Sequence, residues 1–240
     1  MTNFLSTKSI PVNERLIMAL DVPSIDEAKA LVEELGDSVI FYKVGMELFM
    51  CGDYFGFIEW LKARGKKVFV DLKFFDVPAT VGRAIAALSQ KGVDLATING
   101  NDAIMEYAAK NKGDLKVLAV TALTSLDRGD LDDLGFQCDV KELVLSRAKR
   151  ALAIGCDGIV SSGLEVSMLR EQLDNKLLVI TPGVRPVDNR EEDDQKRVVT
   201  VEGAFQNGAD YIVVGRPIRD AKNRKEMAQT IQAQIAAQFV

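Results

Sequence analysis

The sequence predicts a single-domain α/β protein of the (β/α)₈ TIM-barrel class, and three observations lead to this prediction. Short β-branched apolar runs alternate along the 240 residues with longer segments of helical period. About eight such strand–helix units fit into a chain of this length. No linker rich in serine, glycine or proline divides the chain, so residues 1–240 are expected to form one domain, with residues 1–14 as a short leading segment.

The strands are predicted to be parallel, because nearly continuous apolar runs are typical of strands covered on both faces. In chain order they span residues 15–21, 39–45, 67–73, 95–99, 116–123, 158–162, 177–184 and 211–215. Helix starts are marked by Ser24, which has Glu27 at capping-box spacing, and by Pro78 and Pro217. A doubly wound open sheet is the alternative, but such a sheet seldom needs eight consecutive units.

Composition and charge exclude several classes of function. The net charge of -5 argues against nucleic acid or an anionic membrane as the main partner, although it allows a local basic pocket for a small anion. No stretch approaches the roughly 18 apolar residues of a membrane span, and the N-terminus lacks the apolar region of a secretory signal, so a cytoplasmic location is expected. Cys51, Cys138 and Cys156 are too widely spaced for a disulfide framework or a zinc site.

The sequence contains no histidine. This absence removes Ser–His–Asp and Cys–His nucleophile systems, and it removes the commonest metal ligand. Any chemistry must therefore use lysine, aspartate, glutamate or backbone groups.

Ionisable residues stand at the predicted carboxyl ends of the first three strands, where the active-site groups of a barrel lie. Asp21 ends the first strand, Lys43 lies near the end of the second, and Asp71 and Lys73 end the third, with Asp76 just beyond. Because side chains alternate along a strand, Asp71 and Lys73 should share one face. A structural salt-bridge network is the alternative interpretation, but burying charges costs several kcal/mol, and charges retained at a barrel mouth more often mark function.

A second group of residues follows the seventh and eighth strands, where barrels commonly bind phosphate through loop amides and a helix N-terminus. Arg185 lies in TPGVRP, and Gly215 and Arg216 lie in VVGRP. The glycine lets backbone approach a phosphate, and an arginine can bind it through two nitrogens. The mixed-charge loop 186–197 is either a solvated loop or a lid over the mouth, with Gln195 and Arg185 as its expected ligand contacts.

One segment resembles a known family closely. Residues 71–80, DLKFFDVPAT, are similar to the D-x-K-x-x-D-I-P-x-T signature of the orotidine 5′-phosphate decarboxylase family. The similarity covers nearly the whole chain and includes ALDVP around Asp21, YKVG around Lys43, TALTS around Thr124, TPGVRP around Arg185, DDQKRVVT around Gln195 and VVGRPI around Arg216. Several moderately specific motifs in the right order make a stronger signal than any one of them alone.

The sequence departs from the family pattern at four positions, none of which removes a charged residue. Phe75 and Asn99 stand where the family often has histidine, Ala79 stands where it often has asparagine, and Val201 replaces a usual proline. We interpret these differences as tolerated variation.

The resemblance implies a homodimeric enzyme that converts orotidine 5′-monophosphate to uridine 5′-monophosphate, the last step of de novo UMP synthesis, without metal or organic cofactor. It implies that Lys43, Asp71, Lys73 and Asp76 form an alternating charged array, and that Asp76 and Thr80 enter the neighbouring subunit's site. Negative charge left on C6 would be stabilised by the ammonium of Lys73, which would then deliver the proton.

The resemblance also assigns substrate contacts. It implies that Asp21 and Lys43 contact the ribose together with Thr80 of the partner chain, and that Thr124 lies by the pyrimidine. The phosphate would be held by Arg185, Gln195, Gly215 and Arg216. From the residues alone, either Thr80 or Thr124 could hydrogen-bond a polar ligand, but a threonine in such a position is more often a simple capping residue.

Two alternatives stay open at this point. Related phosphate-binding barrels with a D-x-K-x-x-D run act on sugar phosphates by aldol or β-keto acid chemistry and use Mg²⁺, but they resemble the DDQKR and VPAT segments less. A barrel that only binds a nucleotide or scaffolds a partner is the other alternative, and the intact charged array argues against it.

Overall fold

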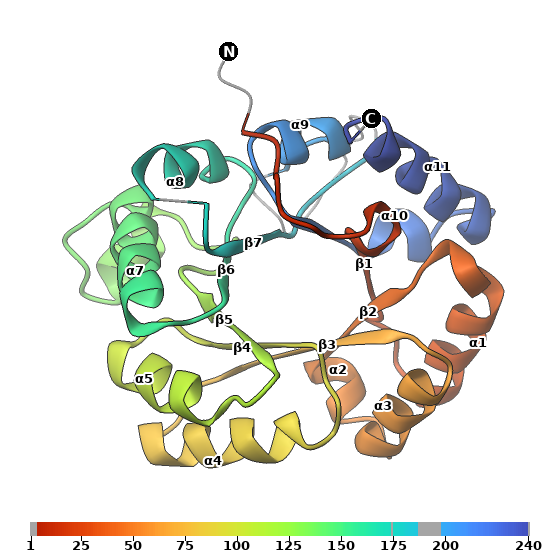
Figure 1. The fold of residues 1–240 in the computed structure, drawn as a ribbon, viewed down its shortest axis with the longest axis horizontal. Helices are drawn as coiled ribbons and strands as arrows, with labels where there is room; N and C mark the ends of the chain where they lie inside the picture. The colour runs from red at the N-terminus through yellow and green to blue at the C-terminus, as the bar shows by residue number, and fades with distance from the viewer. Residues whose placement is uncertain (1–3, 174, 187–197, 240) are drawn as a thin grey trace.

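The computed structural model describes residues 4–173, 175–186 and 198–239. Its eight parallel strands are hydrogen-bonded in chain order and close into one barrel, around which the helices form a ring (Figure 1). The strands are β1 (Leu16–Ala19), β2 (Phe41–Gly45), β3 (Lys67–Phe74), β4 (Leu95–Asn99), β5 (Lys116–Val120), β6 (Gly158–Val160), β7 (Leu178–Thr181) and β8 (Tyr211–Val214). The predicted barrel is confirmed, and the open-sheet alternative is wrong because β8 pairs with β1.

The helices cover the outside of the barrel and begin where the sequence signals predicted. Ser24 accepts a hydrogen bond from the backbone N–H of Glu27 at 3.2 Å, and Pro78 occupies the first turn of α4. The longer helices are α1 (Ile25–Leu35), α3 (Tyr54–Ala63), α4 (Pro78–Ser89), α5 (Asp102–Asn111), α7 (Val140–Ile154), α8 (Val166–Gln172) and α11 (Arg224–Ala236). The shorter elements are the helices α2 (Met46–Phe49), α6 (Arg128–Asp133), α9 (Val201–Gln206) and α10 (Arg216–Arg219) and the 3₁₀ turns η1 (Val12–Glu14) and η2 (Gly36–Ser38).

Two apolar layers fill the fold, which is why the strands are apolar on both faces. Between the strands and the helices lies the larger layer, which includes Leu16, Met18, Tyr42 and Val44. The smaller layer fills the barrel itself with Ile17, Ala19, Phe41, Phe69, Leu95, Leu118, Leu178, Ile180, Tyr211 and Val213. Within the described part of the chain, none of the helices combines the length and apolar character needed to cross a bilayer.

Most strands end earlier than the apolar runs predicted. The ladder of β5 stops at Val120, yet Thr121 and Ala122 beyond it are buried. Burial therefore continues past the last ladder hydrogen bond, and apolar character alone extends the predicted strand too far. At the opposite extreme, β3 continues to Phe74, one residue beyond the prediction.

The amino-terminal end of the barrel carries a repeated ionic contact. An aspartate directly before an even-numbered strand accepts a hydrogen bond from the backbone of the preceding strand and pairs with a basic side chain. The three cases are Asp94 with Val68 N–H and Lys62, Asp157 with Val117 N–H and Lys112, and Asp210 with Val179 N–H and Arg170. Each aspartate thus joins two neighbouring strands to a helix or, at Lys112, to the residue that follows α5.

Asp210 is the most deeply buried of these aspartates, and its side chain is 0% exposed. Its carboxylate contacts Arg170 Nη2 at 2.8 Å and Lys8 Nζ at 3.1 Å, and it also accepts a hydrogen bond from the hydroxyl of Ser6. The residues before β1 are therefore tied to the amino-terminal end of the barrel, opposite the strand ends where active-site groups are expected.

Asp210→Asn is expected to lower the free energy of unfolding by about 3–5 kcal/mol, because it leaves the buried side chain of Arg170 and the partly buried Lys8 without their counterion. Urea denaturation followed by circular dichroism measures this change. Asp157→Asn is the matched control, since the side chain of Asp157 is 24% exposed and pairs with one lysine. A loss for Asp210→Asn no larger than that for Asp157→Asn would contradict the assignment.

Candidate active site

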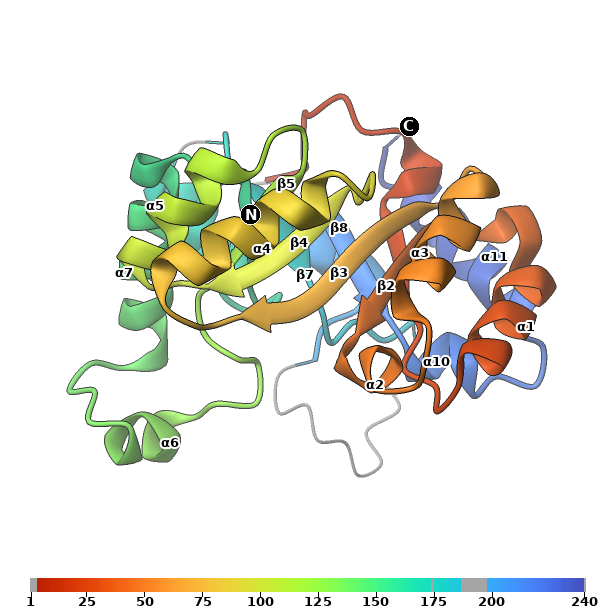
Figure 2. The same ribbon diagram turned by 90° about the horizontal axis from the view of Figure 1, so that it is seen from below.

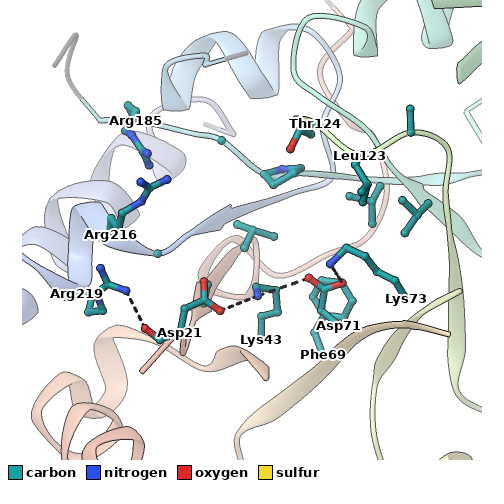
Figure 3. Close-up of a pocket in the computed structure, with 18 residues that line it drawn as sticks. Asp21, Lys43, Phe69, Asp71, Lys73, Leu123, Thr124, Arg185, Arg216 and Arg219 are labelled. Carbon is teal, nitrogen blue, oxygen red and sulfur yellow. Dashed lines mark hydrogen bonds and ion pairs between the residues drawn. The ribbon is translucent and has the colours of Figure 1, made fainter. Parts of the chain in front are cut away.

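A cavity of about 440 Å³ opens at the carboxyl ends of the strands (Figure 3). Ala19 and Val213 lie at its floor with Phe69, and Val120, Leu123 and Val160 add apolar surface on one side. Eight of the residues singled out in the sequence line it, namely Asp21, Lys43, Asp71, Lys73, Thr124, Arg185, Gly215 and Arg216. The fold therefore brings both predicted groups, the charged row and the arginine group, to one space.

Along one wall runs a row of alternating charges. Lys43 Nζ lies 3.0 Å from Asp21 Oδ1 and 3.5 Å from Asp71 Oδ2, and Lys73 Nζ lies 3.0 Å from Asp71 Oδ1. Gly45 is paired with Asp71 across β2 and β3, and a Cβ at Gly45 would lie only 3.3 Å from Lys43 Nζ. A glycine at this position leaves room for the ammonium group.

Burial and charge act in opposite directions on the two central members of the row. Burial alone would raise the pKa of Asp71, but the charges of Lys43 and Lys73, with hydrogen bonds from Lys73 and Thr97, hold it below its usual value. Burial alone would lower the pKa of Lys43, but Asp71 and Asp21 raise it above its usual value. Both groups are therefore charged at neutral pH.

Lys73 differs from Lys43 in its access to the cavity. The side chain of Lys43 is 12% exposed, whereas that of Lys73 is 41% exposed. Figure 3 shows the amine of Lys73 beside Asp71 at the end of the row. A ligand in the cavity can reach Lys73 without breaking the inner pair.

Three arginines lie at the opposite end of the cavity, around Arg216 in Figure 3. Arg219 was missed in the sequence, although it stands one helical turn after Arg216. Its Nη1 donates to the backbone oxygen of Asp21 at 2.8 Å, and its Nε and Nη2 donate to Asp220 at 2.7 and 3.0 Å. A Cβ at Gly215 would lie 3.4 Å from the Cβ of Ala19, so a side chain there would fill the cavity floor.

Thr97 was also missed in the sequence, because its side chain carries no charge and threonine is common in strands. It is 0% exposed and donates to Asp71 Oδ1 at 2.9 Å, while its oxygen accepts the backbone N–H of Lys73 at 2.9 Å. Two residues after the inward-facing Leu95, it is a polar residue on the inner face of β4, and that spacing was the available signal.

Asp76 and Thr80 do not line the cavity of their own chain. Both side chains are exposed; Asp76 accepts a hydrogen bond from the adjacent Val77 N–H at 2.6 Å, and Thr80 accepts one from Arg83 at 3.2 Å. Their predicted contribution to a second subunit stays a prediction. Gln195 lies outside the described residues, as does most of loop 186–197, whose flanks are joined by a bridge between Val184 and Val199.

Several large apolar side chains are exposed, two of them directly beside Asp76 in the sequence. Phe75 and Val77, which flank it, are 73% and 64% exposed, and Met50 after α2 is 75% exposed. Phe55 of α3 and Tyr107 of α5 are exposed as well. Figure 2 shows the side of the molecule formed by α2, α3, β3 and α4.

Among the described residues, no group of three or more acidic or thiol side chains could hold a metal ion.

Comparison with known proteins gives one consistent family. The profile described as "Orotidine 5'-phosphate decarboxylase / HUMPS family" matches residues 14–231. The chain is 72% identical over 239 residues to the orotidine 5′-phosphate decarboxylase of Methylococcus capsulatus, covering 100% of this chain and 99% of the relative. It is 48% identical over 233 residues to that of Xanthomonas campestris, covering 96% of each.

A solved structure agrees with these sequence relatives. The crystal structure of orotidine 5′-phosphate decarboxylase from Lactobacillus acidophilus superposes with a TM-score of 0.82 at 33% identity, covering 92% of this chain and 99% of that chain. The likeness therefore extends over the whole barrel.

Replacing Asp71 with asparagine is expected to change how stability depends on pH. Because the folded-state pKa of Asp71 is lowered, its ionised form adds stability above the unfolded value of about 4, and this contribution is lost as the pH falls through the lower folded value. Urea unfolding of both proteins from neutral pH to about pH 2 measures the effect. Wild type should lose stability relative to Asp71→Asn in the acid part of this range; a constant difference would be the contrary result.

Proposed function

This chain belongs to the orotidine 5′-phosphate decarboxylase / HUMPS family and is a carboxy-lyase of pyrimidine biosynthesis, and we propose that it converts orotidine 5′-monophosphate to uridine 5′-monophosphate without a cofactor. One observation of the site carries the proposal: arginines lie at one end of the cavity, and a row of lysines and aspartates lies at the other. A nucleotide with a phosphate at one end and a carboxylate on its base has anionic groups at both ends, so it matches this arrangement.

The substrate is placed by the two ends of the cavity. Arg185 and Arg216 hold the phosphate with the backbone at Gly215. We also assign Gln195 to the phosphate, because the motif DDQKRVVT in which it lies resembles that of the family. Asp21 and Lys43 contact the ribose, and Thr124 lies by the pyrimidine. This placement directs C6 of the base toward Lys73, and the phosphate contacts supply remote binding energy that orders the reacting end.

Lys73 carries the chemical step in our proposal. The bond between C6 and the carboxyl carbon breaks, CO₂ leaves, and the electron pair remains on C6. Other decarboxylases use a cofactor to accept such a pair, whereas here a fixed ammonium group stabilises it electrostatically. Lys73 then donates a proton to C6, and its neutral amine regains a proton from water.

Asp71 keeps the reacting ammonium in place. Its carboxylate binds Lys73 on one oxygen and faces Lys43 with the other, so both cations have a fixed counterion. The same carboxylate would lie near the carboxylate of the substrate, and that crowding would be relieved as CO₂ leaves.

A homodimer completes the site in our proposal. Asp76 and Thr80 are exposed and lie outside the cavity of their own chain, and the apolar side chains of Phe75 and Val77, which flank Asp76, are exposed as well. Pairing of two copies through this surface would bury those side chains and bring Asp76 and Thr80 to the partner's cavity. The substrate is a small nucleotide, and no nucleic-acid or membrane partner is proposed.

Lys73→Ala is expected to reduce kcat at least about a thousandfold while the protein stays folded, because it removes both the fixed charge and the proton donor. Loss of orotidine 5′-monophosphate absorbance measures turnover, with and without EDTA. Lys222→Ala, which changes an exposed lysine outside the cavity, is the control and should behave as wild type. Near-normal turnover by Lys73→Ala would rule out its role, and loss of wild-type activity in EDTA would favour the Mg²⁺-dependent sugar-phosphate chemistry of related barrels.

Mixing two inactive variants tests the shared site. In a dimer of Lys73→Ala with Asp76→Ala, one cavity carries both lesions and the other carries neither. Random pairing of equal amounts makes half of the dimers mixed, so co-expression should restore about a quarter of wild-type activity.

The matched control combines Lys73→Ala with Asp71→Ala. Both of these lesions fall on a cavity of their own chain, so every site in the mixed dimer stays defective. Equal recovery in the two mixtures, or no recovery in either, would contradict a shared site.

A further inference from the structure

The third strand is irregular where it carries its charged residues. In the pairing of β3 with β4, Val70 is opposite Ala96 and Phe74 is opposite Ile98, so residues 71–73 face Thr97 alone. The two extra residues form a bulge, a feature that often redirects side chains beside an active site. Lys73 has a φ of 47°, the one positive φ of a non-glycine residue in the described chain.

A bulge leaves backbone groups without their ladder partners, and here one side chain replaces the partner. The hydroxyl oxygen of Thr97 accepts the N–H of Lys73 at 2.9 Å. The same hydroxyl donates its only hydrogen to Asp71 Oδ1 at 2.9 Å, and that oxygen also contacts Lys73 Nζ at 3.0 Å. Lys73 is therefore held at its backbone and, through Asp71, at its ammonium group.

We propose that Thr97 is a positioning residue of the decarboxylation site, whose hydroxyl fixes the bulge of β3 and thereby the place of the Lys73 ammonium. The inference rests on the proposed function, because it assigns Thr97 a role through Lys73 and Asp71. Thr97 is fully buried and does not line the cavity, so it acts without touching the substrate.

The hydroxyl, and not the size of the side chain, is the required feature. Valine has nearly the shape of threonine but can neither accept the Lys73 N–H nor donate to Asp71. Serine keeps both capacities and loses only a methyl group. The pair Thr97→Val and Thr97→Ser therefore separates hydrogen bonding from packing.

Thr97→Val is expected to lower kcat for orotidine 5′-monophosphate about 10- to 100-fold, the range expected when a hydrogen bond to a charged group is lost and a reacting group shifts. KM should change less than about threefold, since the arginine end of the cavity is untouched. Thr97→Ser should retain at least about a third of wild-type kcat, because it keeps both hydrogen bonds.

Ser161→Ala is the matched control. The Ser161 side chain is also buried, after β6, and its oxygen has no hydrogen-bond partner among the residues that the structure describes. This variant removes a buried hydroxyl without breaking a contact of the site, so its kcat should stay near that of wild type. Circular dichroism and thermal unfolding confirm that each variant is folded.

The outcomes are separable from those of the proposed function. If wild type lacks decarboxylase activity, the proposed function itself fails. If wild type is active, an unchanged kcat in Thr97→Val, a loss confined to KM, or an equal loss in Thr97→Ser overturns the positioning role. If Thr97→Val does not fold, Thr97→Ala takes its place, because it removes the same hydroxyl. Thr97→Ala must then show the loss of kcat of about 10- to 100-fold while Thr97→Ser stays active.

Discussion

The site depends on the burial of one carboxylate, Asp71, between two ammonium groups. Burial alone would raise the pKa of a carboxylate at this depth and so favour its protonated form. Lys43 and Lys73 reverse that tendency, and Asp71 in turn keeps Lys43 charged. Removing any one of the three would leave an uncompensated charge, so the row behaves as a unit.

That requirement explains several local features of the barrel mouth. Gly45 leaves space for the ammonium of Lys43, and the bulge of β3 brings Lys73 back toward Asp71. The two ends of the barrel then differ in how their charges are used. At the amino-terminal end, Asp210 is enclosed by its donors, whereas at the mouth the side chain of Lys73 remains 41% exposed. Enclosed charges serve stability, and the accessible one is available for a ligand.

Much of this arrangement could be predicted from the sequence. Strand periodicity depends only on neighbouring residues, and the active-site groups of a barrel lie at the carboxyl ends of its strands. These two rules place Asp21, Lys43 and Asp71 on one face of neighbouring strands. The bulge at Lys73 could not be predicted, since it depends on the register between β3 and β4. The position of Thr97 on the inner face could have been predicted from its spacing after Leu95, but its contacts with Asp71 and Lys73 depend on that same register. Asp76 and Thr80 are exposed outside the cavity of their own chain, so the role that the resemblance implies for them stays a prediction.

The residues that line the cavity carry a net positive charge, whereas the whole chain carries a net negative charge. The whole chain carries a net charge of -5, yet among the described residues that line the cavity the cations are Lys43, Lys73, Arg185, Arg216 and Arg219 and the carboxylates are Asp21 and Asp71. The local excess of positive charge lies at the arginine end, because the two lysines of the row face the two carboxylates. A positive potential in a narrow cavity attracts anions. Under the proposed function, the phosphate that the arginine end attracts is common to substrate and product, whereas the carboxylate on the base lies beside a row without net charge. The arginine end therefore serves binding of the nucleotide, and the lysine row acts on the charge that develops at C6.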